Sequence, residues 1–327
     1  MRCLLSGAQR MDGNSSDFLG DFMFHGVINI YKEPGFTSHD VVAKLRGILR
    51  QKKIGHTGTL DPDATGVLPV CLGRATKLCD LLTDRDKTYE AVLLLGKTTD
   101  TQDISGAILK EQPTDHLNEA EVTKVIESFK GTYDQIPPMY SALKVNWKKL
   151  YELAREGKTV ERKSRKVTIY QIHIKEIQLP RVRMEVTCSK GTYIRTLCHD
   201  IGNLLGTGGC MEELTRTKVG RFELKDSLKL EELRDLAQNG RLEDALIPLD
   251  QMFSELQSVV PAEKYIPKAY NGNDFFRNQL SETGKFCSGE KVRVYDAKGH
   301  FIGIYRYMED KKMFHLVKMF LDPEELR

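Results

Sequence analysis

The chain has 327 residues, 29% of them charged, and a net charge of +3, so it is long enough for two domains, one of them with a large core. No apolar run approaches the ~20 residues of a membrane span, which argues against a membrane protein. Seven cysteines, an odd number without a C-x-x-C pair, favour reduced thiols in a cytoplasmic protein over a disulfide framework or a zinc site.

The N-terminal part predicts a short leader followed by a strand and a helix. Residues 1–24 are polar and contain no signal-peptide core, so we expect a disordered extension. Gly26–Tyr31 predicts a strand that ends in the turn Lys32–Gly35. Ser38 is placed to cap a helix over Ser38–Leu49, whose apolar residues recur at helical spacing. The other face of this helix begins a basic cluster: Lys44, Arg46, Arg50, Lys52 and Lys53.

The stretch Gly55–Gly66 (GHTGTLDPDATG) contains three glycines and a proline, which predicts a tight polar loop. It lies between the amphipathic segment Ser38–Leu49 and the apolar run Val67–Leu72. Loops held between rigid elements often carry chemistry. Because Pro62 follows Asp61, the Asp61 backbone is kept extended. The loop therefore presents a carboxylate from a stiff support.

The residues of this loop leave several interpretations open. Asp61 and Asp63 can simply cap nearby backbone N–H groups in a turn. A nucleotide-phosphate loop would need a GK[ST] ending, which this loop lacks. Asp61–Thr65 also matches the D-x-D-x-T pattern of metal-dependent aspartyl phosphatases, in which the first Asp attacks phosphorus. That motif ends a buried apolar strand, whereas Leu60 is the only apolar residue among the six before Asp61.

Periodicity and turn residues predict the later elements. Strands are expected at Val67–Leu72, Thr88–Leu95, Val167–Leu179, Val182–Cys188, Glu290–Tyr295, Phe301–Met308 and Met313–Met319. Helices are expected at Arg74–Leu82, Glu119–Phe129, after Ser189–Thr196, and at Leu230–Asn239. The segment Lys144–Lys166 holds nine basic residues and only three acidic ones. This local excess of positive charge suits a polyanionic partner such as RNA.

Several stretches together resemble one enzyme family. Lys32–Gly35 and GHTGTLDPDATGVLPVCLGRATKL resemble the signature of the TruB-type tRNA pseudouridine synthases. Further resemblances follow in the family's order over roughly Gly26 to Phe222, at Lys87–Ala91, Gln135–Val145, Leu150–Gly157, Ser189–Thr196 and Gly206–Phe222. Two departures are visible, with Trp147 where the family usually has glycine and Thr215 where a second arginine is common.

The resemblance implies roles for individual residues. Asp61 is implied as the catalytic aspartate, which attacks C1′ of the target nucleotide or removes its C2′ proton. Tyr89 is implied to stack on the flipped uracil and to help remove its C5 proton. Arg195 is implied to pair with Asp61 and keep it ionised at neutral pH. The implied substrate-binding residues are His56, which fills the gap left by the flipped base, and Lys32, Leu214, Tyr193, Lys144, Lys148, Lys149 and Arg155.

The resemblance also implies the architecture and the activity. We expect an α+β fold in which a mixed, mainly antiparallel sheet is flanked by helices over residues 25–250, with the basic insertion at about 134–166 as an RNA clamp. Residues 251–327 are expected to form a small PUA-like β domain that binds RNA. The implied reaction converts uridine 55 in the T-loop of tRNA to pseudouridine, by a monomer that needs no cofactor, metal or protein partner. A metal-dependent aspartyl phosphatase and a non-catalytic tRNA-binding or tRNA-folding module remain the alternatives.

Overall fold

The structure is a computed structural model that describes residues 23–145 and 147–322. Of the extension predicted over residues 1–24, residues 1–22 lie outside this described part. Phe24 is tied to the body, because its N–H donates to Gln51 Oε1 at 2.9 Å and its carbonyl accepts from Gln51 Nε2 at 3.0 Å. Among the described residues, no helix combines the length and the apolar character that crossing a membrane requires.

Ten strands form the main sheet, whose path runs β14–β1–β3–β12–β4–β11–β10–β7. Every neighbouring pair on this path is antiparallel except β12 and β3, which are parallel, so the predicted mixed and mainly antiparallel sheet is confirmed. The strands are β1 (Gly26–Lys32), β3 (Thr65–Leu72), β4 (Lys87–Leu95), β7 (Gly131–Gln135), β10 (Arg165–Gln178), β11 (Arg181–Cys188), β12 (Gly209–Val219) and β14 (Ile247–Pro248), with β2 (Ile54–His56) on β3 and β13 (Phe222–Glu223) on β12.

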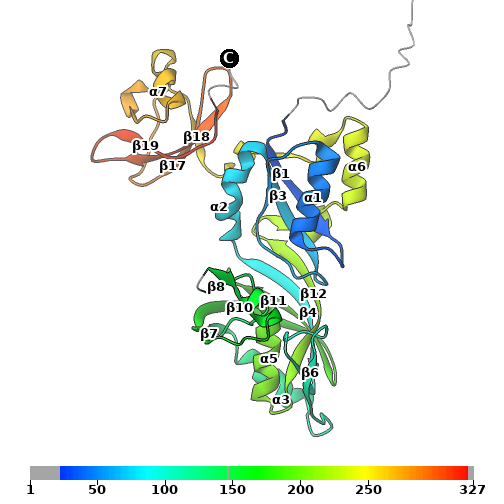
Figure 1. Cartoon of the computed structure of the whole chain (residues 1–327). Coiled ribbons are helices and arrows are strands. Elements are labelled where there is room, and N and C mark those ends of the chain that lie inside the picture. Colours follow the sequence, from blue (N-terminus) through cyan, green and yellow to red (C-terminus); the bar gives the residue numbers. More distant parts are fainter. Residues whose placement is uncertain (1–22, 146, 323–327) are drawn as a thin grey trace, which may run out of the picture.

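Helices cover the two ends of this sheet separately. Helices α1 (Ser38–Leu49) and α6 (Leu230–Gln238) pack on β1 and β3 through one apolar cluster. Helices α3 (Glu119–Glu127) and α5 (Ile194–Leu204) pack on β4, β10 and β11 through another. Figure 1 shows the two pairs at opposite ends of the larger body, with β4 and β12 running between them. Two half-cores therefore share one continuous sheet.

The cap of α1 differs from the sequence expectation. Thr37, not Ser38, is the N-cap: its Oγ1 accepts from Asp40 N at 3.1 Å, and the Asp40 carboxylate accepts from Thr37 N at 2.8 Å. This reciprocal box needs an acidic residue three positions after the cap, and Asp40 stands there for Thr37. Ser38 is buried instead, and its Oγ accepts from Leu60 N at 2.9 Å. The start of α1 is thereby bonded to the residue before Asp61.

The predicted strands and helices are otherwise found, and the largest addition is β12. Sequence analysis predicted no strand over Gly209–Val219, yet β12 lies in the middle of the sheet. The predicted helix at Arg74–Leu82 is a 3₁₀ turn, η1 (Gly73–Leu78), followed by α2 (Cys79–Thr83). The remaining short elements are β5 (Lys97–Thr99), β6 (Ile108–Glu111), β8 (Lys144–Val145), β9 (Lys148–Lys149), α4 (Leu150–Arg155), η2 (Leu224–Asp226), η3 (Leu242–Ala245) and η4 (Asp250–Phe253).

A second sheet of five strands follows, in the order β15–β17–β18–β19–β16. Its core is aromatic, because Phe275, Tyr305, Tyr307 and Phe314 are all fully buried. Figure 1 shows this unit set to one side of the larger body, near α2. Its elements are β15 (Gln257–Val259), η5 (Glu263–Tyr265), α7 (Ile266–Tyr270), β16 (Phe275–Phe276), η6 (Arg277–Gln279), β17 (Lys291–Tyr295), β18 (Phe301–Met308) and β19 (Met313–Met319).

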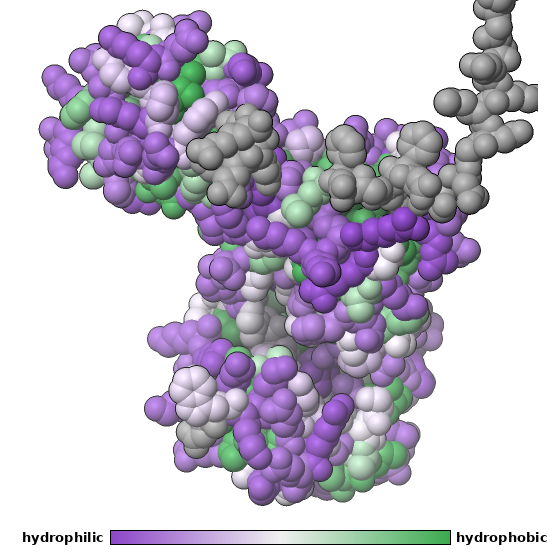
Figure 2. Space-filling view, turned by 45° about the horizontal axis from the view of Figure 1, so that its top comes forward, coloured by the Kyte–Doolittle hydropathy of each residue, from purple (hydrophilic) through white to green (hydrophobic). Residues whose placement is uncertain are grey.

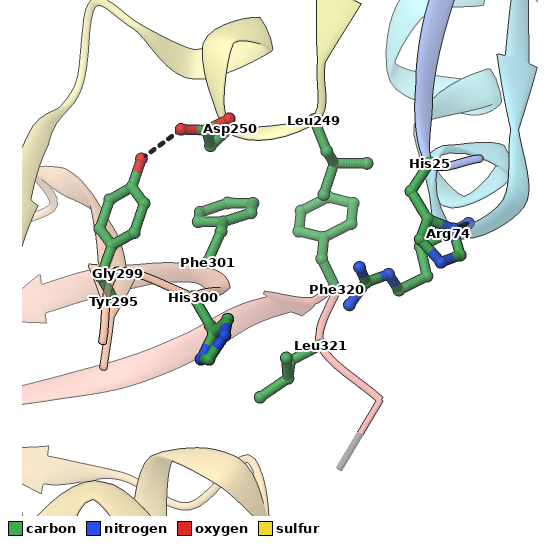
Figure 3. A pocket seen from close by; sticks show the side chains of 10 residues that line it. All are labelled: His25, Arg74, Leu249, Asp250, Tyr295, Gly299, His300, Phe301, Phe320 and Leu321. Carbon is green, nitrogen blue, oxygen red and sulfur yellow. Dashed lines mark hydrogen bonds between the residues drawn. The ribbon is translucent and has the colours of Figure 1, made fainter. Parts of the chain in front are cut away.

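The two sheets are joined by packing as well as by the chain. An apolar cluster contains Val27 and Leu249 from the first sheet region and Ile304 and Phe320 from the second. Between the two lies a cavity of about 360 Å³, lined by His25, Arg74, Leu249, Asp250, Tyr295, Gly299, His300, Phe301, Phe320 and Leu321. In Figure 3 the Tyr295 hydroxyl donates to Asp250 at one side of this cavity. None of the site residues predicted from the sequence lines it.

Candidate active site

The loop that carries Asp61 is held on several sides by backbone hydrogen bonds. It leaves β2 and returns as β3, and these two strands pair with each other. Gly35 N donates to Pro62 O at 3.0 Å, and Ala64 N closes a turn onto Asp61 O at 3.2 Å. With the bond from Leu60 N to Ser38 Oγ, each side of Asp61 is fixed. The structure thus supports the sequence prediction of a stiffly held carboxylate.

Arg195, at the start of α5, binds the Asp61 carboxylate through two nitrogens. Its Nη2 donates to Asp61 Oδ1 at 3.0 Å, and its Nε lies 2.9 Å from Oδ2. The same guanidinium donates to Tyr140 O at 2.9 Å and to Thr101 O at 3.0 Å, and Nη1 lies 3.4 Å from Asp103 Oδ2. A planar guanidinium is suited to this arrangement because its donors form a rigid fork. Arg195 therefore joins the Asp61 loop, the turn at Thr101–Asp103 and Tyr140 to the start of α5.

The side chains of Arg195 and Asp61 differ sharply in their exposure to solvent. The Arg195 side chain is 6% exposed, whereas that of Asp61 is 35% exposed. Although part of Asp61 faces solvent, its surroundings are mostly protein, and this burial raises the pKa of its carboxyl above the usual value. The neighbouring Arg195 and Lys32 cations oppose the rise, while the Asp103 charge adds to it. The ion pair thus offsets only part of the effect of burial on the Asp61 pKa.

Lys32 supports the loop from beneath. It is fully buried, and its Nζ donates to Ala64 O at 2.6 Å, to Pro62 O at 2.8 Å and to Glu33 O at 3.1 Å. All three ammonium protons therefore point to main-chain carbonyls. Burial lowers the pKa of Lys32 to about 8, although the Asp61 charge opposes this shift. The sequence prediction made Lys32 a substrate-binding residue, and the structure places it under the loop.

Tyr89 and Arg216 lie opposite each other on neighbouring strands β4 and β12. Arg216 is 1% exposed, and its guanidinium donates to the carbonyls of Val67, Thr59 and Gly58. Its charge lies beside Tyr89, which is 9% exposed. Burial raises the pKa of Tyr89 to about 12, so its hydroxyl is protonated at neutral pH. Arg216 thus holds both ends of the Asp61 loop from a position opposite Tyr89.

Sequence reasoning missed Arg216, although a signal was present. Leu214 and Arg216 are two positions apart and both buried, so the arginine occupies an apolar face of β12. A charged residue in phase with buried ones is costly unless it is fully hydrogen-bonded. Because no strand was predicted at β12, sequence reasoning had no basis for placing Arg216 on the same face as Leu214. The predicted pocket residue Leu214 does lie near Tyr89, in the same apolar cluster.

Asp103 is the second residue that the sequence analysis missed. Its Oδ1 accepts from Thr101 Oγ1 at 2.8 Å and from Ser105 Oγ at 2.6 Å, while Oδ2 faces Arg195. The neighbouring Gln102 has a positive φ of 64° and accepts from Thr196 Oγ1 at 2.7 Å. This turn follows β5 and resembles no motif, so nothing in the sequence pointed to it. It supplies the second carboxylate of the site.

His56 and Tyr193 are positioned by their own neighbours. His56 Nδ1 accepts from Gly58 N at 3.3 Å, and the ring lies edge-on to His39 with centroids 5.3 Å apart. Burial, reinforced by His39, lowers the pKa of His56 to about 4, so its ring is neutral at pH 7. The backbone N–H of Tyr193 donates to Gln135 Oε1 at 2.8 Å, and its carbonyl accepts from Gln135 Nε2 at 3.0 Å. Burial also raises the pKa of Tyr193.

The basic insertion is connected directly to this site. After Tyr140, whose carbonyl accepts from Arg195, the chain forms the β8–β9 hairpin and then α4. The hairpin base is closed by Leu150 N donating to Leu143 O at 2.8 Å and Tyr151 N donating to Ser141 O at 3.1 Å. The four basic residues predicted to bind substrate lie on these elements: Lys144, Lys148, Lys149 and Arg155. Figure 2 shows hydrophilic residues over much of one face, and a hollow between the upper and lower parts of the larger body.

The phosphatase alternative does not fit this geometry. Its motif would end a buried strand, but β2 ends at His56 and Asp61 lies within the following loop. Within residues 23–145 and 147–322, no group of three or more His, Cys, Asp or Glu side chains is placed to hold a metal ion. The second carboxylate near Asp61 is engaged by Arg195 instead.

Solved structures with this fold were found by comparison. A Cbf5–Nop10–Gar1 complex gives a TM-score of 0.68 at 28% identity, over 92% of this chain and 86% of that one. An H/ACA RNP bound to a substrate RNA containing 2′-deoxyuridine gives 0.67 at 26% identity, over 91% and 86%. Both likenesses extend over nearly the whole described chain.

Sequence comparisons identify the class and then the family. Residues 46–194 match the N-terminal domain of the TruB family pseudouridylate synthases, and residues 195–254 match the tRNA pseudouridylate synthase B C-terminal domain. The fold and these matches are thus those of a pseudouridylate synthase, an isomerase. A protein of Lachnoclostridium phytofermentans, named tRNA pseudouridine synthase B, is 53% identical over 91% of this chain and 100% of its own length. One of the same name from Alkaliphilus oremlandii is 47% identical over 85% and 92%. The chain belongs to the TruB family.

Proposed function

We propose that this chain isomerises uridine 55 in the T-loop of tRNA to pseudouridine. The observation that carries the proposal is the Asp61 carboxylate, fixed by Arg195 and still 35% exposed, whose charge lies near enough to Tyr89 to affect the pKa of its hydroxyl. In the reaction the N1–C1′ bond breaks and a C5–C1′ bond forms. The proton leaves C5 and N1 gains one, so atoms and electrons balance within the nucleotide.

The target base must leave its stack before Asp61 can reach the sugar. Once the base is flipped, the Tyr89 ring offers a stacking surface, and Leu214 lines the same pocket. The neutral ring of His56 is suited to filling the gap left in the loop. Asp61 then acts on the sugar, either by attacking C1′ or by removing the C2′ proton to give a glycal. Both routes require the ionised carboxylate.

The other site residues hold Asp61 and Tyr89 in position. Arg195 fixes both carboxylate oxygens, and Lys32 fixes the carbonyls of Pro62 and Ala64 that flank the loop tip. Arg216 hydrogen-bonds the loop from a position opposite Tyr89, and so helps to set the distance between the Tyr89 ring and the Asp61 carboxylate. A misplacement of about 1 Å in such a site costs on the order of 100-fold in rate.

RNA binding is assigned to the basic insertion and the second sheet. Lys144, Lys148, Lys149 and Arg155 project from an insertion that begins at the Arg195 contact, where they can bind phosphates of the T-arm. We assign residues 251–327, as a PUA-like domain, to the acceptor end of the tRNA. The six described cysteines form no disulfide, which suits the reducing cytoplasm, and we assign the chain to act there as a monomer.

The decisive experiment measures pseudouridine in an unmodified tRNA transcript, with EDTA present, after incubation with the wild type or Asp61→Asn. Conversion at the T-loop uridine by the wild type only is the expected result. Conversion by both proteins would remove Asp61 from the mechanism. If neither protein converts the uridine while both bind the transcript, the chain is a tRNA-binding or tRNA-folding module.

A further inference from the structure

Trp147 is a large apolar side chain that the protein leaves in solvent. It is the only tryptophan of the chain, and it is 95% exposed. The next most exposed large apolar side chains among the described residues are Leu109, at 66%, and Leu204, at 62%. An indole in contact with water gains nothing from burial, so Trp147 contributes no packing to this fold.

The backbone at Trp147 is also unfavourable for a tryptophan. Trp147 lies in the connection between β8 and β9, where Val145 pairs with Lys148, and it has a φ of +70°. This left-handed conformation is costly for a bulky L-residue, whereas glycine adopts it freely. The chain thus keeps tryptophan at a position where local structure favours glycine. A side chain held against both burial and backbone preference is a candidate for binding.

The surroundings of Trp147 favour a polyanion. Lys144, Lys148 and Lys149 lie on the two short strands beside it, and α4 follows with Arg155. One of these charges is offset by an ion pair, Lys148 to Glu156 at 3.0 Å, with Glu156 at the C-terminal end of α4. Proteins that bind unpaired nucleic acid combine such basic groups with exposed aromatic rings on which bases stack.

The hairpin is anchored at the active site. Trp147 lies seven residues after Tyr140, whose carbonyl accepts from Arg195. At no more than ~3.6 Å per residue, Trp147 is therefore within about 25 Å of that carbonyl. A short stretch of chain thus joins Trp147 to the residue that contacts Arg195, the partner of Asp61.

We propose that Trp147 is a base-stacking residue, which binds an unpaired base of the substrate RNA next to the target uridine. The proposal rests on the proposed function, because it takes tRNA as the substrate. The basic residues of the hairpin bind phosphates, and the indole adds a contact that depends on an accessible base face. Trp147 would thereby select RNA with loop nucleotides over continuous duplex.

The single tryptophan makes this contact directly measurable. Because the chain has no other tryptophan, fluorescence excited at the long-wavelength edge, where its tyrosines do not absorb, reports Trp147 alone. Asp61→Asn protein is titrated with an unmodified T-arm hairpin and with a blunt RNA duplex of equal length, and affinity is measured independently by filter binding. The expected result is saturable quenching by the hairpin, at the Kd found by filter binding, and little quenching by the duplex.

Substitutions test whether the contact contributes affinity. Trp147→Gly should weaken hairpin binding about 5- to 150-fold, the range of one base–aromatic stack, while Trp147→Phe should retain most of it. Glycine suits the backbone here, so loss of binding cannot be attributed to misfolding. Leu109→Ala, which removes an exposed apolar side chain from β6, is the matched control and should bind like the wild type.

Each outcome separates this proposal from the function on which it rests. If the wild type converts the uridine but Trp147 shows no quenching, or Trp147→Gly binds with wild-type affinity, the stacking role is overturned and the enzyme activity stands. If the wild type neither binds nor converts the transcript, the proposed function fails and the stacking role falls with it.

Discussion

Arg195 binds both oxygens of the Asp61 carboxylate, at 3.0 Å from Nη2 and 2.9 Å from Nε, from a position that is almost fully buried. The remaining guanidinium donors go to Tyr140, Thr101 and Asp103, so the arginine cannot move without breaking several contacts. This relationship fixes the orientation of the carboxylate while one side of it stays open. The rate of reaction should therefore depend on Arg195 far more than RNA binding does.

Arg195→Ala should bind tRNA with an affinity close to that of the wild type and lower turnover by at least about 100-fold, because Asp61 loses its orientation. Arg195→Lys keeps the charge without the two-pronged contact, and should also be strongly impaired. Single-turnover rates and filter binding on the same transcript would separate the two effects. Turnover within a few-fold of wild type in Arg195→Ala would contradict the positioning role.

The pH dependence should reveal the shifted pKa of Asp61. Burial raises this pKa and the Asp103 charge adds to the rise, while Arg195 opposes it. Since the ionised carboxylate is the active form, activity should fall on acidification at a higher pH than an ordinary aspartate would give. Asp103→Asn removes a negative charge, so the acidic limb of its kcat/KM profile should move to lower pH.

A matched control separates that charge from the hydrogen bonds around it. Ser105→Ala removes a donor to Asp103 Oδ1 and leaves the charge in place. Its acidic limb should stay where the wild-type limb is, even if the rate falls. An equal shift in both variants would show that loop geometry, not the Asp103 charge, sets the limb.

How much of this site the sequence could predict depends on how local each signal is. Asp61 lies in a loop whose glycines and proline are visible in twelve residues, Gly55–Gly66, and its geometry followed from them. The Arg195 pairing joins residues 134 positions apart, and only the family resemblance pointed to it. Asp103 and Arg216 have no such motif. They became visible only once α5, β4 and β12 were brought together in space.

For the fold, too, elements with a local sequence pattern were predicted, and those that depend on distant residues were not. Strands with a clear apolar pattern, such as β1, β4 and β11, were predicted within a few residues. The central strand β12 was not, because its register with β4 shifts twice and Glu212, Glu213 and Lys218 interrupt its apolar face. The Thr37 cap was missed by one position, although the spacing Thr37-x-x-Asp40 of a capping box is visible in the sequence. Long-range pairing supplied what local patterns lacked.

Tyr89→Phe tests what the tyrosine hydroxyl does. Phenylalanine keeps the ring for stacking, so RNA binding should change little. It removes the hydroxyl that lies beside the Arg216 charge and that the family resemblance implies helps to remove the C5 proton. Turnover should fall by about 100-fold or more, the usual contribution of a group that transfers a proton. Rapid-quench measurement of tritium release from C5-labelled uridine would check this, and a wild-type rate would leave only the stacking role.

Gly66 permits the close approach of β3 to Arg216, and its substitution should be costly. Its φ is +104°, and a Cβ at this position would lie 2.2 Å from the Arg216 carbonyl oxygen. Gly66→Ala should therefore lower the free energy of unfolding by roughly 2–5 kcal/mol, from backbone strain together with overpacking. Gly35→Ala is the control, because Gly35 also has a positive φ but open space around it, and should lose only about 1–2 kcal/mol. Urea unfolding followed by circular dichroism would measure both, and equal losses would show that the contact with Arg216 does not constrain β3.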